Sequence, residues 1–193
     1  MRCFQPPLSS ALGLMKLLRR TFVALLALLG ISVKSAAQTS PSMGPELRQM
    51  FLKTTASKAG VSANAQFPHV FGVALDWPIN ENIATVISLS DGSASLYTTS
   101  TFGIIGGVSH ESVRVAARHF VSVAEQYLAA SSPTSTYPYP LPGKIRFYLL
   151  TYEGVRAIDA DAQATYSGTG KFSPLFGAAQ DVVTQLRVVT ENK

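Results

Sequence analysis

The stretch that decides the fold is IATVISLSDGSASLYTT, residues 83–99. Apolar residues alternate with small or polar ones on both sides of Asp91-Gly92, which is the pattern of strands with one buried face. Asp-Gly between two such runs predicts a type I′ turn, because that turn needs positive φ at both central residues. The stretch therefore predicts a β-hairpin with strands at 83–89 and 94–99.

The residues before this hairpin predict a third strand at 70–77, ended by Pro78, which has no N–H to donate. Its large apolar residues occupy alternate positions and are expected to share one face. They are Phe71, Val73, Leu75 and Trp77. Asp76 interrupts this apolar strand, and burial would raise the pKa of its carboxyl group. We expect its side chain instead to accept hydrogen bonds from the backbone N–H groups of a turn.

Periodic apolar residues predict three helices. A short helix is expected at 45–55, with Pro45 at its first position. A helix of about twenty residues follows Ser109, its expected N-cap, and carries apolar residues spaced three and four apart. A last helix is expected to begin with Ser173 as its cap and to continue to Val189.

The segment between the two long helices predicts a second hairpin. Residues 144–152 and 155–160 flank a tight turn, and the proline-rich segment 131–143 before them predicts an extended crossover. The fold class is therefore α+β: a single antiparallel sheet of about five strands, a β-meander of three and then a hairpin, with two long helices and a short N-terminal helix packed on it. Profilin-like and roadblock-like domains have a loosely similar element order, but a shared topology does not define a function.

The net charge of +5 belongs to the first part of the chain. Five of the 16 Lys and Arg residues lie before residue 38, where there is no Asp or Glu, so the other 11 balance all 11 acidic residues. A neutral domain lacks the basic surface that phosphate backbones need, so we expect no nucleic-acid partner. The single cysteine, Cys3, forms no disulfide framework, and the three His residues match no metal motif. We therefore expect no metal and no cofactor.

Three parts are predicted along the chain: a leader at 1–37, a polar linker at 38–44 and a single domain at 45–193. The apolar run 21–33 follows Arg19-Arg20 and precedes Ser35-Ala36-Ala37, which is the order of a secretory signal peptide. Cleavage would place the domain in the periplasm or outside the cell. Two alternatives stay open. In the first, the start of the chain was assigned too far upstream and the leader is not cleaved, so that it anchors the domain in a membrane. In the second, translation starts near Met43 and the protein is cytoplasmic.

Four motifs stand out in the segment 71–117: Asp76-Trp77-Pro78, the run 91–97, Ile105-Gly106-Gly107, and the run 110–114 (His-Glu-Ser-Val-Arg). With them the segment resembles a family of small, uncharacterised bacterial proteins, and the similarity extends more loosely through 146–150 to the last helix. The resemblance implies an α+β fold and a bacterial source but no activity, so no functional residue is carried over. Members of that family usually lack an export leader, and residues 1–42 depart from that pattern.

The glycine-rich loop before the second helix is the strongest candidate for a ligand site. Free backbone N–H groups and the helix dipole favour an anion at a helix N-terminus, and a His and an Arg four residues apart share a face there. The candidate residues are Gly103, Gly106, Gly107, Ser109, His110 and Arg114. The loop lacks the Lys of a nucleotide-binding P-loop. The same pattern also fits a tight loop beside a bulky helix and a solvated helix face.

The sequence contains no nucleophile elbow and no paired catalytic groups at a recognisable spacing, so we predict no catalytic residues. It favours a non-enzymatic domain that binds another protein or a second copy of itself, because its helices are apolar over more than one stripe. The alternative is an anion- or small-ligand-binding domain, with or without enzymatic activity, that uses the glycine-rich loop.

Overall fold

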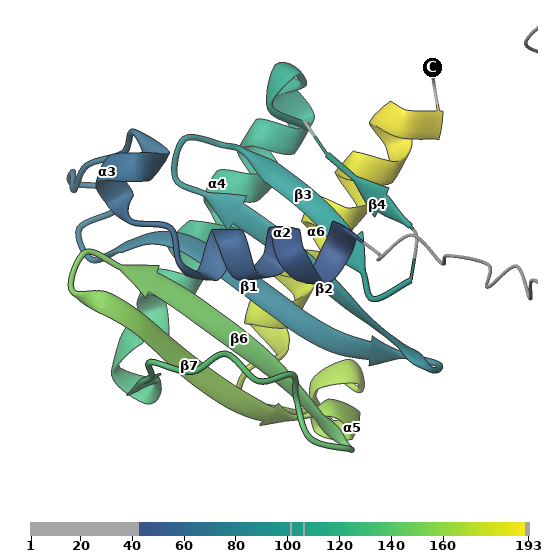
Figure 1. Ribbon diagram of the computed structural model, residues 1–193. Helices are drawn as coiled ribbons and strands as arrows, with labels where there is room; N and C mark the ends of the chain where they lie inside the picture. The colour runs from purple at the N-terminus through teal and green to yellow at the C-terminus, as the bar shows by residue number, and fades with distance from the viewer. Residues whose placement is uncertain (1–42, 101, 106, 192–193) are drawn as a thin grey trace, which may run out of the picture. The chain divides into compact units, whose positions relative to one another are not determined.

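The computed structural model describes residues 43–100, 102–105 and 107–191. One seven-stranded antiparallel sheet runs through these residues in the order β4-β3-β2-β1-β6-β7-β5 (Figure 1). Its strands are β1 (Val70–Ile79), β2 (Asn82–Leu89), β3 (Ala94–Thr98), β4 (Gly103–Ile104), β5 (Ser132–Pro133), β6 (Lys144–Thr151) and β7 (Gly154–Asp161). The predicted α+β class and single antiparallel sheet are confirmed, whereas the predicted number of about five strands is too low.

The two strands that the sequence did not predict lie at opposite edges of the sheet. Strands β4 and β5 have two residues each, which is too short for an alternating pattern. β5 lies in the predicted extended crossover and contains Pro133, which is tolerated because an edge strand need not donate every N–H.

The chain reverses direction at Asp91-Gly92, as predicted, and β2 pairs with β3 across this turn. The predicted type I′ turn is wrong, because Gly92 has a φ of 94° but Asp91 does not have positive φ. Instead, the N–H of Gly92 donates to the carbonyl of Leu89 at 3.0 Å, and the Asp91 carboxylate accepts from the N–H of Ser93 at 2.7 Å. The side chain of Asp91 thus stabilises a longer turn that needs only one left-handed residue.

Helices cover both faces of the sheet (Figure 1). The long helices α4 (Glu111–Gln126) and α6 (Ser173–Glu191) lie on one face, and α2 (Met43–Leu52) lies on the other. The remaining helical turns are α3 (Ala56–Ala59), η1 (Gly107–Ser109), η2 (Leu128–Ala130) and α5 (Ala162–Tyr166). The two long helices and the short N-terminal helix are therefore present. In the described residues no helix combines the length and the apolar character needed to cross a bilayer.

Ser109 is not the N-cap of α4. It is the last residue of the 3-10 turn η1, and His110 occupies the cap position with no side-chain hydrogen bond to the helix. The 3-10 turn, which has no signature in the sequence, moves the start of the helix by one residue.

Two clusters of buried apolar side chains hold the layers together. The larger cluster lies between the sheet and the two long helices and takes in Val113 and Phe120 of α4 and Val182 and Leu186 of α6. The broad apolar faces of these helices are therefore mostly buried, and they leave only Val115 and Val188 among the strongly exposed apolar residues of the two helices. The smaller cluster lies under α2.

Phe71 does not share a face with Val73, Leu75 and Trp77, contrary to the prediction. It packs in the smaller cluster beneath α2, and the other three pack in the larger cluster. The pairing of β1 with β6 shifts by one residue between Val70 and Gly72. Such a bulge reverses the side-chain alternation at one point, so Phe71 faces the opposite side of the sheet.

Candidate functional site

The structure places the predicted anion-site residues along one stretch at the β4 edge of the sheet. Gly103 lies in β4, Gly107 begins η1, His110 caps α4 and Arg114 lies in its first turns. Gly106 lies outside the described residues. The predicted set is thus contiguous, but closeness along the chain does not yet make a binding site.

Gly107 is buried, and its lack of a side chain is needed for packing. A Cβ at this position would lie 2.6 Å from Cγ1 of Val113 and 2.7 Å from Cδ2 of Leu186. Both distances are shorter than real Cβ contacts, so a side chain at residue 107 would force Val113 and Leu186 to move. This contact accounts for the glycine without any ligand.

Arg114 already has protein partners for its guanidinium. Its Nη1 donates to the carbonyl of Val108 at 2.8 Å, and its Nη2 is paired with the carboxylate of Glu111. The aliphatic part of Arg114 also packs against Gly92 in the β2–β3 turn, and Arg118 donates to the carbonyl of Asp91 at 3.3 Å. The two arginines therefore tie helix α4 to the hairpin, and anion binding at Arg114 and His110 stays a prediction.

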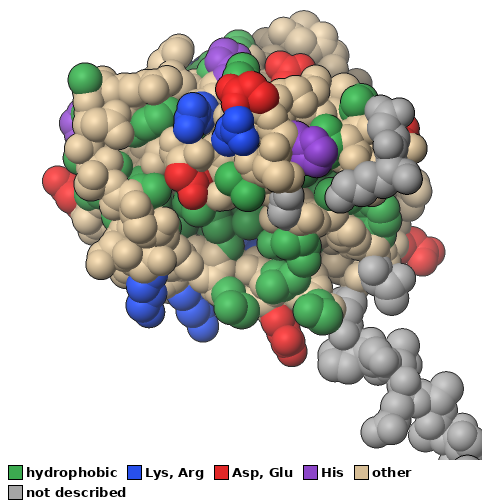
Figure 2. Space-filling view, turned by 90° about the horizontal axis from the view of Figure 1, so that it is seen from above, with side chains coloured by type: hydrophobic (Ala, Val, Ile, Leu, Met, Phe, Trp, Pro, Cys, Tyr) green, Lys and Arg blue, Asp and Glu red, His purple; other side chains and the backbone are tan. Residues whose placement is uncertain are grey.

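The same edge carries a group of exposed apolar side chains, which we call the β4 edge surface. Phe102, Ile105 and Val108 expose 54, 64 and 44% of their surface. They flank β4, whose outer side pairs with no other described strand. Figure 2 shows the molecule from above: hydrophobic side chains gather over the lower middle of this face, and Lys, Arg, Asp, Glu and His side chains lie directly above them.

The two edges of the sheet differ in the residues that they carry. At the edge opposite β4, β5 pairs with β7. Strand β5 contains Pro133, and β7 carries Arg156 and Asp159. Proline and charged residues on edge strands prevent pairing with other chains. The seventeen residues 93–109, which include β4, contain no proline and no charged residue. Among the described residues, the β5–β7 edge therefore carries proline and charge, whereas β4, which has only two residues, carries neither.

A buried ion pair connects α2 to the sheet. Arg48 and Asp76 are 1% and 0% exposed, and Nε of Arg48 donates to both carboxylate oxygens at 3.0 and 2.9 Å. Thr85 donates its hydroxyl to the same carboxylate at 2.5 Å. The Arg48 Nη1 donates to the carbonyl of Tyr137 at 3.0 Å, and the ring of Tyr139 lies 4.2 Å from the guanidinium carbon. The pair thus joins α2, β1, β2 and the proline-rich crossover.

This pair overturns the predicted role of Asp76 as a turn acceptor. Burial raises the pKa of Asp76, and the hydrogen bonds from Arg48 and Thr85 oppose that rise. The carboxylate accepts hydrogen bonds from the guanidinium of Arg48 and the hydroxyl of Thr85 and is buried away from solvent, so its role is structural. The sequence contained one signal, an Asp within an apolar strand, but nothing in it identified Arg48 as the partner.

No group of three His, Cys, Asp or Glu side chains in the described residues is arranged to hold a metal ion. A comparison of the chain with protein-family models, with curated proteins and with solved structures finds no match. The resemblance to a family of small bacterial proteins therefore stays a prediction from the motifs in 71–117.

Proposed function

We propose that this protein is a non-enzymatic interaction domain whose partner is a second copy of the same chain, bound through the β4 edge. The observation that supports this is the contrast between the two edges of one sheet. The β5–β7 edge carries the proline and charges that prevent strand pairing, and the β4 edge carries exposed apolar side chains instead.

Antiparallel pairing of two β4 strands would be symmetric, since each copy offers the same edge to the other. Backbone N–H and C=O groups on the outer side of β4 would then find partners, as in other cases of strand addition. Phe102 and Ile105 would also lose their contact with water, and full burial of one such side chain contributes about 1.5–3 kcal/mol.

The test is the mass of the purified full chain by sedimentation velocity over a range of protein concentrations. We expect a dimer for the unaltered chain and a monomer for Ile105→Lys, because a lysine on the edge surface adds the missing charge. Leu141→Lys is the matched control, since Leu141 is 68% exposed and lies in the proline-rich crossover just before β6. That variant should remain a dimer.

A monomer for the unaltered chain at the highest concentration would refute the proposal. So would an Ile105→Lys variant that associates as the unaltered chain does. If Leu141→Lys also became monomeric, association would run through another surface and the β4 assignment would be wrong.

Export stays a prediction from residues 1–37, which lie outside the described residues. N-terminal sequencing of the protein from its native cell distinguishes the alternatives. Gln38 at the terminus would mean cleavage of the leader, and Met43 or the following residue would mean a cytoplasmic start.

A further inference from the structure

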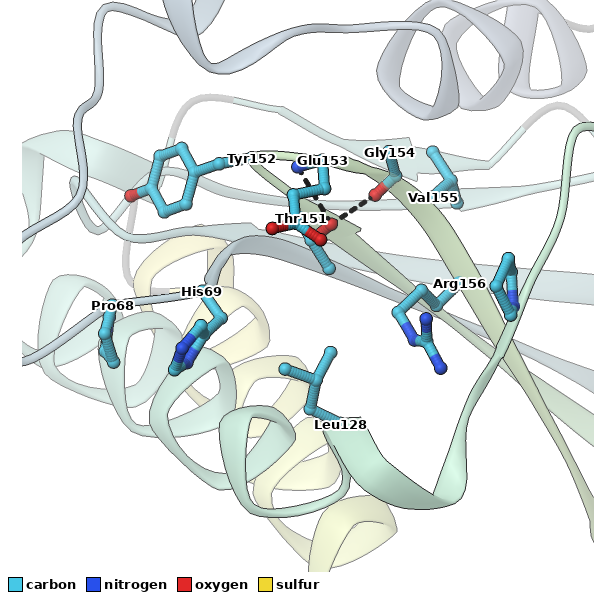
Figure 3. Close-up of a pocket in the computed structure, with 10 residues that line it drawn as sticks. Pro68, His69, Leu128, Thr151, Tyr152, Glu153, Gly154, Val155 and Arg156 are labelled. Atoms are coloured by element: carbon cyan, nitrogen blue, oxygen red, sulfur yellow. Dashed lines mark hydrogen bonds between the residues drawn. The ribbon is translucent and has the colours of Figure 1, made fainter.

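A hollow of about 250 Å³ lies where the β6–β7 turn, the residues before β1 and the segment after α4 come together (Figure 3). His69 and Pro68 lie on one side of it and Arg156 lies on the other, with Glu153 and Thr151 above and Leu128 below. The hollow is formed by the β6–β7 half of the sheet and does not include the β4 edge surface.

The imidazole of His69 is held by Glu125 of helix α4. Its Nδ1 lies 2.5 Å from one carboxylate oxygen, and the other oxygen accepts from the backbone N–H groups of His69 and Val70 at 3.3 and 2.8 Å. An ionised carboxylate only accepts hydrogen bonds, so Nδ1 carries the proton in this pair. In the neutral imidazole, Nε2 is then left as a hydrogen-bond acceptor.

The guanidinium of Arg156 is fixed at the other side. Its Nε donates to the Ser131 hydroxyl at 2.7 Å, and its Nη2 donates to the Ser131 carbonyl at 2.5 Å. Within the described residues Nη1 has no hydrogen-bond partner. A cation with one free pair of N–H donors is therefore held in place at the wall of the hollow.

Glu153 supplies the opposite charge. The turn that carries it is fixed, because its N–H donates to the Thr151 hydroxyl at 3.2 Å and that hydroxyl donates to the carbonyl of Gly154 at 2.7 Å. The Glu153 carboxylate itself has no ion pair among the described residues. The hollow therefore offers an anionic acceptor and a cationic donor, and its other walls include Pro68 and Leu128, which are apolar.

We propose that this hollow binds a small zwitterion of the class of free α-amino acids with an apolar side chain. The ligand carboxylate accepts from Nη1 of Arg156, and the ammonium group donates to the Glu153 carboxylate. The apolar side chain packs against Pro68 and Leu128. A ligand with only one of the two charges leaves one of these protein groups unpaired.

The test is isothermal titration calorimetry of the full chain with three probes: L-leucine, 4-methylpentanoate, which lacks the ammonium group, and 3-methylbutylamine, which lacks the carboxylate. L-leucine should bind, and each of the other two should bind at least about tenfold more weakly. Glu153→Gln should weaken L-leucine binding by about tenfold and leave 4-methylpentanoate unchanged, since the carboxylate partner is intact. Glu81→Gln, an exposed glutamate at the β1–β2 turn, is the matched control and should change nothing.

The proposal is overturned if no heat of binding is found with L-leucine at millimolar concentration. It is also overturned if 4-methylpentanoate binds as tightly as L-leucine, because the ammonium group then has no role. Equal effects of Glu153→Gln and Glu81→Gln would show that binding occurs elsewhere. Circular dichroism of both variants, whose substitutions lie in exposed turns, confirms that they fold.

Discussion

Removing one partner of the buried Arg48–Asp76 pair should destabilise the domain far more than removing one partner of an exposed pair on the same sheet. In Asp76→Ala, Arg48 loses all three of its hydrogen bonds to the carboxylate and keeps two backbone carbonyls and the rings of Tyr139 and Tyr148 as partners, none of which carries a negative charge. The guanidinium cannot lose its proton, so an uncompensated charge stays buried between α2 and β1.

The size of the effect follows from this burial. Loss of one partner of a buried ion pair costs about 3–5 kcal/mol. For a domain of this size, 1 kcal/mol corresponds to about 2–4 °C in Tm, so Asp76→Ala should lower Tm by about 6–20 °C. Asp159→Ala is the matched control, since Asp159 pairs with Arg146 on the neighbouring strands but its side chain is 50% exposed. That substitution should cost at most about 1 kcal/mol.

Urea unfolding of the full chain measures both variants, with the fluorescence of Trp77 as the signal. Trp77 is the single tryptophan, is 8% exposed and follows Asp76 directly, so it reports on the unfolding of this part of the sheet. Equal losses of stability in Asp76→Ala and Asp159→Ala would refute the assignment of the buried pair as a link between α2 and the sheet.

The reciprocal variant Arg48→Met adds a pH dependence. Burial raises the pKa of Asp76, and without Arg48 the main opposition to that rise is gone. The folded state of the variant then holds a proton that the unfolded state releases, so its stability increases as the pH falls through the raised pKa of Asp76 toward the ordinary carboxyl pKa. Asp76→Ala should lack this gain, because the arginine that it leaves behind does not titrate in that range. The same pH profile in both variants would contradict this account.

Two further predictions concern glycine packing and a helix cap. Gly107→Ala should destabilise the domain by about 1–3 kcal/mol, because the added Cβ would meet Val113 and Leu186. Gly177→Ala in α6 places its Cβ in open space and should stabilise the domain by about 0.5–1 kcal/mol. Thermal unfolding of both variants measures these changes, and a stabilising effect of Gly107→Ala would contradict the packing argument. The Asp161 carboxylate accepts a hydrogen bond from the backbone N–H of Ala164 at the start of α5, and this bond lowers the pKa of Asp161. Asp161→Ala should therefore reduce the free energy of unfolding at neutral pH, and the difference from the unaltered chain should decline as the pH falls below the ordinary carboxyl pKa of about 3.9. A difference in stability that persists in acid would show that the charge of the cap has no role.

Local patterns predicted the long elements well. The hairpin at Asp91-Gly92 and the two long helices follow from alternation, turn chemistry and helical spacing, which depend on residues close in sequence. The short edge strands and the 3-10 turn before α4 were missed because two or three residues carry no period. The wrong sheet face was predicted for Phe71 because the bulge between Val70 and Gly72 depends on the pairing of β1 with β6, which local alternation does not show.

The surfaces that carry the two proposals were harder to predict. The absence of charge in 93–109 was visible in the sequence, but its meaning depends on β4 being an edge, which follows from the strand order. The hollow depends on residues as far apart as His69, Glu125 and Arg156. No spacing motif connects them, because they lie just before β1, in α4 and in β7, which meet only when the sheet and α4 pack together.

The sequence by itself determined the α+β class, the two hairpins, the long helices and the balanced charge of the residues after position 37, because each of these rests on neighbours along the chain or on composition. Only the tertiary structure decided which strands form the two edges of the sheet, that Asp76 is paired with Arg48, and that His69, Glu153 and Arg156 line one hollow. These features depend on groups brought together from distant positions, whose interaction energies exist only once the layers have packed.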